Sequence, residues 1–162
     1  MAYWACAQLM PQRERLALHT LTLAGYVTYL PRLRQHRVSH GRRIETTPAL
    51  FPGYAFLLVE LQWHTARWAP GVARIVLDGA APARVPDAVI AEIRSRERGG
   101  LIELPRPPKH RPGDKVKVLH GPFAGHVGLY AGMKPRERVE VLLAILGGAQ
   151  RVTLPKEAVE AV

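Results

Sequence analysis

The sequence is poor in cysteine and in long apolar runs. Its 162 residues contain one cysteine, Cys6, which excludes an intrachain disulfide and a zinc site built on cysteine pairs. No uncharged apolar run approaches the roughly 18 residues that indicate a membrane-spanning helix. The N-terminus lacks the basic region of a secretory signal. These absences predict a cytoplasmic protein that makes no contact with a membrane.

Acidic side chains are also scarce. The chain has 13 Asp and Glu against 23 Lys and Arg, a formal net charge of +10 and a pI of about 10.5. A soluble protein this basic usually binds a polyanion, most often nucleic acid, although plain solubility is an alternative.

Groups for catalysis or metal binding are few. The three aspartates, Asp78, Asp87 and Asp114, fall in different segments, so no carboxylate pair suggests itself for acid–base catalysis. His36 and His40 are four residues apart, but in a strand-to-loop segment and not on a helix face that could hold a metal. We therefore expect no enzymatic activity, no metal site and no cofactor.

The distribution of basic residues indicates two domains. Residues 1–98 hold thirteen Arg, no Lys and seven acids, a net charge of +6, whereas all five Lys lie in residues 99–162, which have a net charge of +4. Between them, LIELPRPPKHRPG has four prolines and no periodicity, which is typical of a linker. The sequence predicts a first domain at 1–98, a Pro-rich linker at 99–110 and a second domain at 111–162.

The first domain is predicted to be α+β, an antiparallel sheet with helices. YWACAQL reads as a strand, and PQRERLALHTLTLAG as an amphipathic helix with Ala17, Leu21 and Ala24 on one face. QWHTARWA fits one or two helical turns, and GVARIVL a short strand. PDAVIAEIRSRERGG fits a second helix, with Val89, Ile90 and Ile93 facing inward and Gly99–Gly100 at its end.

The second domain is predicted to be a small all-β barrel. DKVKVL, HVGLYAG, VEVLLAIL and QRVTL read as short strands separated by Gly or Pro turns. RERVEVLLAIL also fits a helix. Val139 and Val141, with Gly147–Gly148 after them, favour a strand. Phe123 falls inside the turn GPFAG, where it either meets a partner or folds back to plug the barrel.

The run LFPGYAFLLVEL, residues 50–61, does not alternate between apolar and polar residues as a half-buried strand should. On a regular strand Tyr54, Phe56 and Leu58 share one side, and the residues between them share the other. The sequence does not say which side is inward. Either helices cover both faces, or one face awaits a partner, for which aromatic side chains are the better anchors.

A basic segment precedes this strand. RLRQHRVSHGRR concentrates five arginines in twelve residues without an acid: Arg32, Arg34, Arg37, Arg42 and Arg43. Such a row could follow the phosphates of a nucleic acid, or it could be a solvated hairpin. Arg13 and Arg15, on the wet side of the first helix, extend the set of candidate nucleic-acid-binding residues.

These motifs together resemble the NusG family of transcription elongation factors. LFPGYAFL follows a basic hairpin, and GPFAGHVG near the C-terminus resembles the core of a KOW domain. The resemblance covers residues 1–98, as the family's N-terminal domain, and 111–162, as its SH3-like KOW barrel. WHTARW and GAAPARVPDAVIAEI are more similar to the specialised RfaH branch.

The resemblance implies a non-catalytic, monomeric antitermination factor that binds the clamp helices of RNA polymerase and suppresses pausing. The implied polymerase-binding residues are Trp4, Phe51, Pro52, Tyr54 and Phe56, with His64 and Thr65 reaching the opposite side of the cleft. The RfaH branch has His-Thr-Thr there, and Ala66 replaces the last hydroxyl; alternatively, Thr65 caps a short helix.

The resemblance also implies further partners. The arginines would hold the non-template DNA strand, and Phe123 would recruit a ribosomal protein or a termination factor. In the RfaH branch the C-terminal domain can fold as helices and mask the polymerase site, but glycines 121, 125 and 128 disfavour a helix here. The rival interpretation is an RNA-binding or ribosome-associated KOW protein without polymerase contact.

Overall fold

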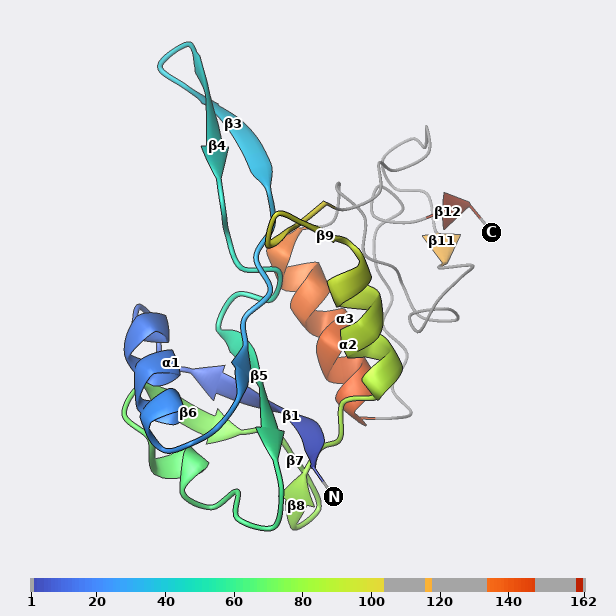
Figure 1. The fold of residues 1–162 in the computed structure, drawn as a ribbon. Helices are drawn as coiled ribbons and strands as arrows, with labels where there is room; N and C mark the ends of the chain where they lie inside the picture. Colours follow the sequence, from blue (N-terminus) through green and yellow to red (C-terminus); the bar gives the residue numbers. More distant parts are fainter. Residues whose placement is uncertain (1, 104–115, 118–133, 148–159, 162) are drawn as a thin grey trace. The chain divides into compact units, whose positions relative to one another are not determined.

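The computed structural model describes residues 2–103, 116–117, 134–147 and 160–161 (Figure 1). The chain divides into two compact, discontinuous units. Unit 1 comprises Met1–Leu30 and Gly53–Asp87, and unit 2 comprises Pro31–Pro52 and Ala88–Val162. The boundary expected at residue 110 lies outside the described residues and stays a prediction, as do the strands expected at HVGLYAG and QRVTL.

Unit 1 is built on a four-stranded antiparallel sheet with the strand order β2-β5-β1-β6. The strands are β1 (Tyr3–Leu9), β2 (Thr28–Tyr29), β5 (Tyr54–Val59) and β6 (Val72–Ile75). β1 and β5 lie at the centre, in a register that pairs Cys6 with Phe56. The strands expected at YWACAQL, LFPGYAFLLVEL and GVARIVL are therefore confirmed.

One face of this sheet packs against the helix α1 (Glu14–Leu23). Ala17 and Leu21 are buried, as the helical pattern predicts, in a core cluster with alternate residues of β1 and β5 and with Val72 and Ile75 of β6. Ala24, expected on the same face, is exposed at the end of the helix, as are Leu16 and Leu23. A Cβ added to Gly71 would lie 2.7 Å from the Ala17 backbone nitrogen, so the chain between Trp68 and β6 can pass close to α1 only with glycine there.

Short elements complete unit 1. Of the one or two helical turns expected at QWHTARWA, the structure has one, the 3-10 helix η1 (Ala66–Trp68). After β6, a small hairpin joins β7 (Leu77–Asp78) and β8 (Ala81–Pro82). Val85 then bridges Trp4 on β1.

Unit 2 begins with a long hairpin of β3 (Gln35–Ser39) and β4 (Arg42–Thr46) (Figure 1). The two residues between the strands, His40 and Gly41, both have positive φ angles, 51° and 77°. That backbone is the two-residue turn that matches the right-handed twist of paired strands. The basic segment RLRQHRVSHGRR therefore lies largely on a β-hairpin, with His40 and Gly41 at its tip.

The second helix is confirmed as α2 (Asp87–Ser95), with Val89, Ile90 and Ile93 buried. It ends four residues before Gly99, so the prediction that Gly99–Gly100 stop it is wrong. Both glycines have positive φ and form the turn between β9 (Glu97–Arg98) and β10 (Leu101–Ile102). Ile102 is fully buried and pairs with Leu33, so the first residues assigned to the linker belong to folded structure.

The largest departure from the sequence analysis is the helix α3 (Pro135–Gly147). We expected a barrel strand at VEVLLAIL, and that prediction is wrong. Val141, Leu142, Ala144 and Leu146 are buried, a spacing that matches one face of a helix. Of the rest of the expected barrel, the structure describes one antiparallel pair, β11 (Val116–Lys117) with β12 (Glu160–Ala161).

The α+β class, with antiparallel sheets and helices, is confirmed. Among the described residues, no helix has the length and apolar character needed to cross a membrane.

Candidate functional site

The strand β5 presents two apolar faces. Ala55, Leu57 and Val59 lie in the core cluster that α1 covers. The opposite side of the central strands carries Tyr54, Phe56 and Leu58 from β5 and, by the register, Trp4 and Cys6 from β1. Tyr29 of β2 stacks on Phe56, with ring centroids 6.2 Å apart. We call Trp4, Tyr29, Tyr54, Phe56 and Leu58 the aromatic face.

The centre of the aromatic face is buried and its margins are partly open. Phe56 is only 1% exposed, whereas Trp4, Tyr29, Tyr54 and Leu58 are half-buried. Cys6, which pairs with Phe56, is fully buried. Burial raises the pKa of the Cys6 thiol to about 12, against a smaller opposing effect of the Arg74 charge. The thiol is therefore neutral at physiological pH and packs as a small apolar group.

The turn that leads into β5 holds two further candidates, Phe51 and Pro52, in unit 2. Phe51 is 1% exposed and Pro52 is exposed. The Leu50 N–H donates to the Pro31 carbonyl, 2.9 Å away, which fixes the start of the turn.

The helix α3 is attached to this turn through Arg138, which the sequence analysis did not single out. Arg138 is 1% exposed, and its Nε donates to the Leu50 carbonyl at 2.8 Å. Burial lowers the pKa of Arg138, and the neighbouring charge of Glu137 partly offsets that shift. A buried guanidinium is costly unless it is hydrogen-bonded, so this contact ties α3 to the residue directly before Phe51. The helical reading of RERVEVLLAIL was the only available signal for it.

His64 and Thr65 lie in the loop between β5 and η1. The His64 ring stacks on the Trp63 ring at 4.1 Å and is exposed. The Thr65 side chain makes no capping bond to η1, so the capping alternative is wrong. Its hydroxyl is hydrogen-bonded to the Tyr26 hydroxyl, which itself donates to the Gln62 carbonyl. Thr65 thus braces this loop against the chain leading to β2.

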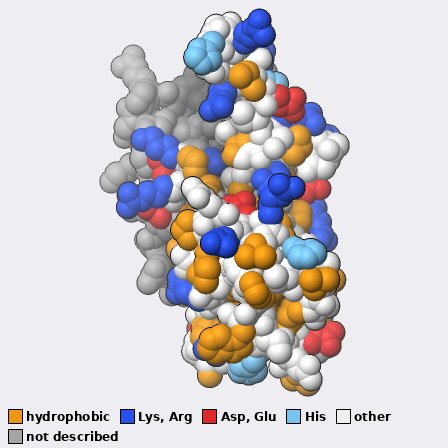
Figure 2. All heavy atoms as spheres, turned by 90° about the vertical axis from the view of Figure 1, so that its left-hand side faces the viewer, with side chains coloured by type: hydrophobic (Ala, Val, Ile, Leu, Met, Phe, Trp, Pro, Cys, Tyr) orange, Lys and Arg blue, Asp and Glu red, His pale blue; other side chains and the backbone are white. Residues whose placement is uncertain are grey.

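The basic candidates of unit 2 divide into two groups. Arg37, Arg42 and Arg43 are exposed on the β3–β4 hairpin, and Figure 2 shows Lys/Arg and His side chains at the tip of this hairpin, at the top of the view. Arg34 instead pairs with Glu45 at 3.2 Å and Glu103 at 3.1 Å, and Arg32 contacts the Thr47 carbonyl at 3.4 Å. Three arginines of the hairpin are therefore directed to solvent, and two are engaged near its base.

Arg13 and Arg15, in unit 1, are exposed at the start of α1. Phe123 lies outside the described residues. Within the part of the chain that the structure describes, no group of His, Cys, Asp and Glu could hold a metal ion.

A partly open aromatic face and a solvent-directed arginine hairpin are features of a protein that binds other macromolecules. A family model described as "NusG: Transcription termination factor nusG" matches residues 2–94. The Thermus thermophilus transcription termination/antitermination protein NusG is 31% identical over 127 residues, which cover 70% of this chain and 68% of that protein. The chain belongs to the NusG family.

Two further comparisons extend over more of the chain. The protein of the same name from Escherichia coli K12 is 28% identical over 155 residues, covering 91% of this chain and 84% of its own. A solved structure, "Domain interaction in Thermotoga maritima NusG", aligns over 85% of this chain and 83% of that chain, with 21% identity and a TM-score of 0.47. As a member of this family, the protein is a transcription factor and not an enzyme.

Proposed function

We propose that the protein binds RNA polymerase through the aromatic face and suppresses pausing during elongation. The observation that carries the proposal is the two-sided apolar character of β5. One side fills the core of unit 1, and the other presents Trp4, Tyr54 and Phe56 on regular strands. Aromatic side chains on a rigid sheet are effective anchors for a protein partner, because they bury a large area at a small loss of side-chain entropy.

Docking requires a conformational change. Phe56 and Phe51 are each 1% exposed, so neither offers its surface to a partner in the state described. Within unit 2, the Arg138–Leu50 hydrogen bond holds α3 at the turn that carries Phe51. We propose that α3 leaves this turn before polymerase docks, so that the observed state is a closed one.

His64 provides a second contact. It is exposed in the loop between β5 and η1, outside the strands that carry the aromatic face. Thr65, held by Tyr26, fixes the loop that presents it. A protein that touches both sides of the polymerase cleft would bind the closed, processive state better than the paused one, and this difference in affinity is sufficient to shift the balance between them.

The hairpin arginines and the C-terminal domain complete the proposal. Arg37, Arg42 and Arg43 would hold the displaced non-template strand by its phosphates, with Arg13 and Arg15 as a second basic site. The C-terminal residues, including Phe123, would recruit a ribosomal protein or a termination factor, brought to a high local concentration by the linker.

The test is the effect of Tyr54→Ala on binding to core RNA polymerase. Tyr54 is only half-buried, so its truncation should remove a partner contact while the sheet persists. Truncation of an aromatic anchor typically costs about 2 kcal/mol of binding free energy, or roughly a 30-fold loss of affinity. Leu61→Ala, at an exposed site beyond the end of β5, is the matched control and should bind normally.

Affinity should be measured per folded molecule, with the folded fraction taken from circular dichroism. If Tyr54→Ala reduces the folded fraction but not the affinity of the folded protein, Tyr54 belongs to the core and the docking proposal fails. If the unmodified chain binds RNA but not polymerase under conditions that release α3, the ribosome-associated alternative takes its place.

A further inference from the structure

Unit 1 carries a second binding feature that none of the candidate residues above explains. Trp68, at the end of η1, is 75% exposed, an unusual position for the largest apolar side chain. It borders a hollow of about 320 Å³ between η1 and the edge strand β6. The hollow is lined by seven residues of unit 1: Trp63, Arg67, Trp68, Ala73, Arg74, Ile75 and Leu77.

The aromatic and cationic groups of this hollow are stacked. The Arg67 guanidinium lies 5.1 Å from the centre of the Trp68 ring and 5.9 Å from that of Trp63. Cation–π attraction to both rings holds Arg67 between them. Trp63 is buried in the core cluster, so the stack is anchored at its inner end and open at Trp68.

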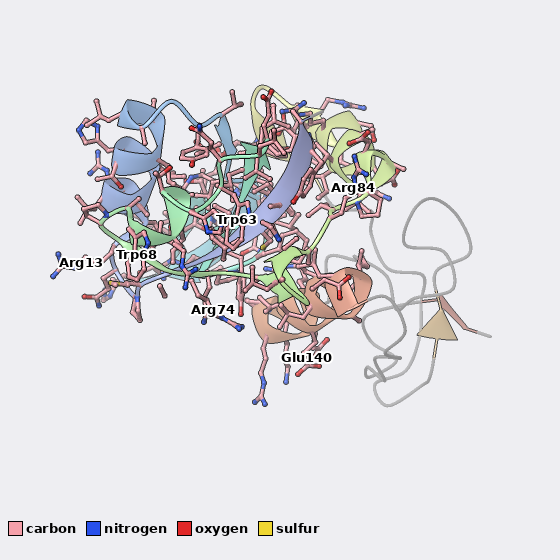
Figure 3. The ribbon with its side chains drawn as sticks, turned by 90° about the horizontal axis from the view of Figure 1, so that it is seen from below. Arg13, Trp63, Trp68, Arg74, Arg84 and Glu140 are labelled. Carbon is pink, nitrogen blue, oxygen red and sulfur yellow. The ribbon has the colours of Figure 1, made fainter. Side chains whose placement is uncertain are left out.

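The charge of the hollow has one sign. Among the described residues that line it, only Arg67 and Arg74 are ionisable. Arg74 is oriented by a hydrogen bond from its Nε to the Gln8 side chain. In Figure 3, Trp68 and Arg13 lie at the same end of unit 1, with Trp63 further inside. An occupant should therefore combine a planar apolar group with negative charge.

We propose that this hollow binds an unpaired nucleobase of a single-stranded nucleic acid, stacked on Trp68, with its phosphates at Arg67 and Arg74. Stacking on an aromatic side chain accepts every base, and arginines beside the ring follow the backbone. An acidic peptide would match the charge but not the open tryptophan ring. The site is separate from the hairpin arginines, which can contact phosphates but have no Trp, Tyr or Phe among the residues of β3 and β4.

The inference rests on the nucleic-acid-binding part of the proposed function and on none of the polymerase contacts. The test compares Trp68→Ala with Leu61→Ala, which truncates another exposed apolar side chain of unit 1. The probes are a short oligothymidylate and the same backbone carrying abasic sites, and the readout is fluorescence anisotropy. Oligouridylate replaces oligothymidylate in a second arm, which tells whether DNA or RNA is preferred.

We expect Trp68→Ala to weaken oligothymidylate or oligouridylate binding by roughly 5- to 150-fold, and Trp68→Phe to retain part of it. Neither change should alter binding of the abasic strand by more than Leu61→Ala does. Arg67→Gln and Arg74→Gln should weaken binding to both kinds of strand, and each should reduce the slope of log affinity against log salt by about 0.7.

Four outcomes would overturn the proposal. Equal effects of Trp68→Ala and Leu61→Ala would show that the ring is not used. Equal losses on intact and abasic strands would exclude stacking. A comparable loss of polymerase binding without any oligonucleotide would make Trp68 a protein contact. Loss of binding in hairpin variants alone would leave the proposed function intact while rejecting this site.

Discussion

At the scale of single residues, two buried ionisable side chains, Cys6 in unit 1 and Arg138 in unit 2, contribute to the fold in different ways. Cys6 in unit 1 is held neutral by burial, and its thiol adds only packing. Arg138 in unit 2 acts as a hydrogen-bond donor, because its Nε donates to the Leu50 carbonyl. Removing a packing group leaves a small cavity, whereas removing Arg138 leaves the Leu50 carbonyl without its donor, which is the costlier change.

The raised pKa of Cys6 predicts a pH dependence of stability. The folded thiol has a pKa of about 12, against an ordinary value of 9.0 for a solvated cysteine. Between these values the unfolded chain loses the proton while the folded chain keeps it, so the free energy of unfolding falls as pH rises above 9. The loss approaches about 1.4 kcal/mol per pH unit from this one group.

The measurement is the urea-unfolding free energy of the native chain and of Cys6→Ala at pH 8 and at pH 10.5. The native chain should lose more stability over this interval, because the other titrating groups are common to both proteins. Parallel losses would contradict the assigned pKa. As an independent check, a thiol reagent at pH 8 should label Cys6 slowly until urea unfolds the sheet.

At the scale of elements, the β3–β4 hairpin illustrates how local structure positions charge. Its register places Arg37 and Arg42 on one side, with Ser39 and Ile44, and Arg43 on the other, with Val38. The arginines thus point to both sides of one two-stranded ribbon. Near the base of the hairpin, Glu45 and Glu103 form salt bridges with Arg34, and the arginines nearer the tip are left to solvent.

Replacing Arg37, Arg42 and Arg43 by Gln should weaken binding of single-stranded DNA and flatten its salt dependence. Each lost phosphate contact should reduce the slope of log affinity against log salt by about 0.7. Binding isotherms at several salt concentrations provide the measurement. Arg34→Gln is the control: it should alter the slope little, since Arg34 already has carboxylate partners. An unchanged slope in the triple variant would show that the hairpin charge is merely solvated.

Prediction from the sequence succeeded where one local pattern had one interpretation. YWACAQL read only as a strand, and the inward set Val89, Ile90 and Ile93 of α2 fits only the helical period. RERVEVLLAIL combines β-branched valines with good helix formers, so its local preference for strand or helix is weak. Its tertiary environment therefore determines which of the two forms. The bond from Arg138 to Leu50 spans 88 residues, and no local pattern contains it.

The same limit applied to the candidate site. The two-residue period of a strand predicted which side chains of β5 share a face. It did not predict the burial of Phe56, which depends on distant parts of the chain. Arg34 was grouped with the free arginines because the twelve-residue segment has no acid. Its partners, Glu45 and Glu103, lie beyond that segment. No local pattern marked Trp68 as exposed, because a tryptophan ordinarily packs inward.

At the scale of the whole molecule, we expect polymerase binding to be coupled to the release of α3 from the turn that carries Phe51. If α3 must leave its contacts first, the apparent affinity for polymerase is reduced by the small fraction of molecules in the open state. Any change that weakens α3 without touching the aromatic face should then strengthen binding.

Ala144→Gly tests this coupling. Ala144 is buried within α3, and glycine in a helix costs about 1 kcal/mol relative to alanine. The apparent affinity for core polymerase should rise about five-fold. Ala91→Gly, the same substitution at an exposed site in α2, is the matched control and should leave it unchanged. Equal or reduced affinity of Ala144→Gly would contradict a closed state that opens on binding.

Because the chain is synthesised from its N-terminus, the Arg138–Leu50 contact forms late. A polypeptide emerges from the ribosome N-terminus first, and its early units fold as they appear. All strands of the unit 1 sheet are made by Ile75, whereas Arg138 follows Leu50 by 88 residues. At synthesis rates of about 5–20 residues per second, several seconds pass between the synthesis of Leu50 and that of Arg138, which donates to its carbonyl. A newborn chain therefore passes through an interval in which the turn before β5 has not yet met α3.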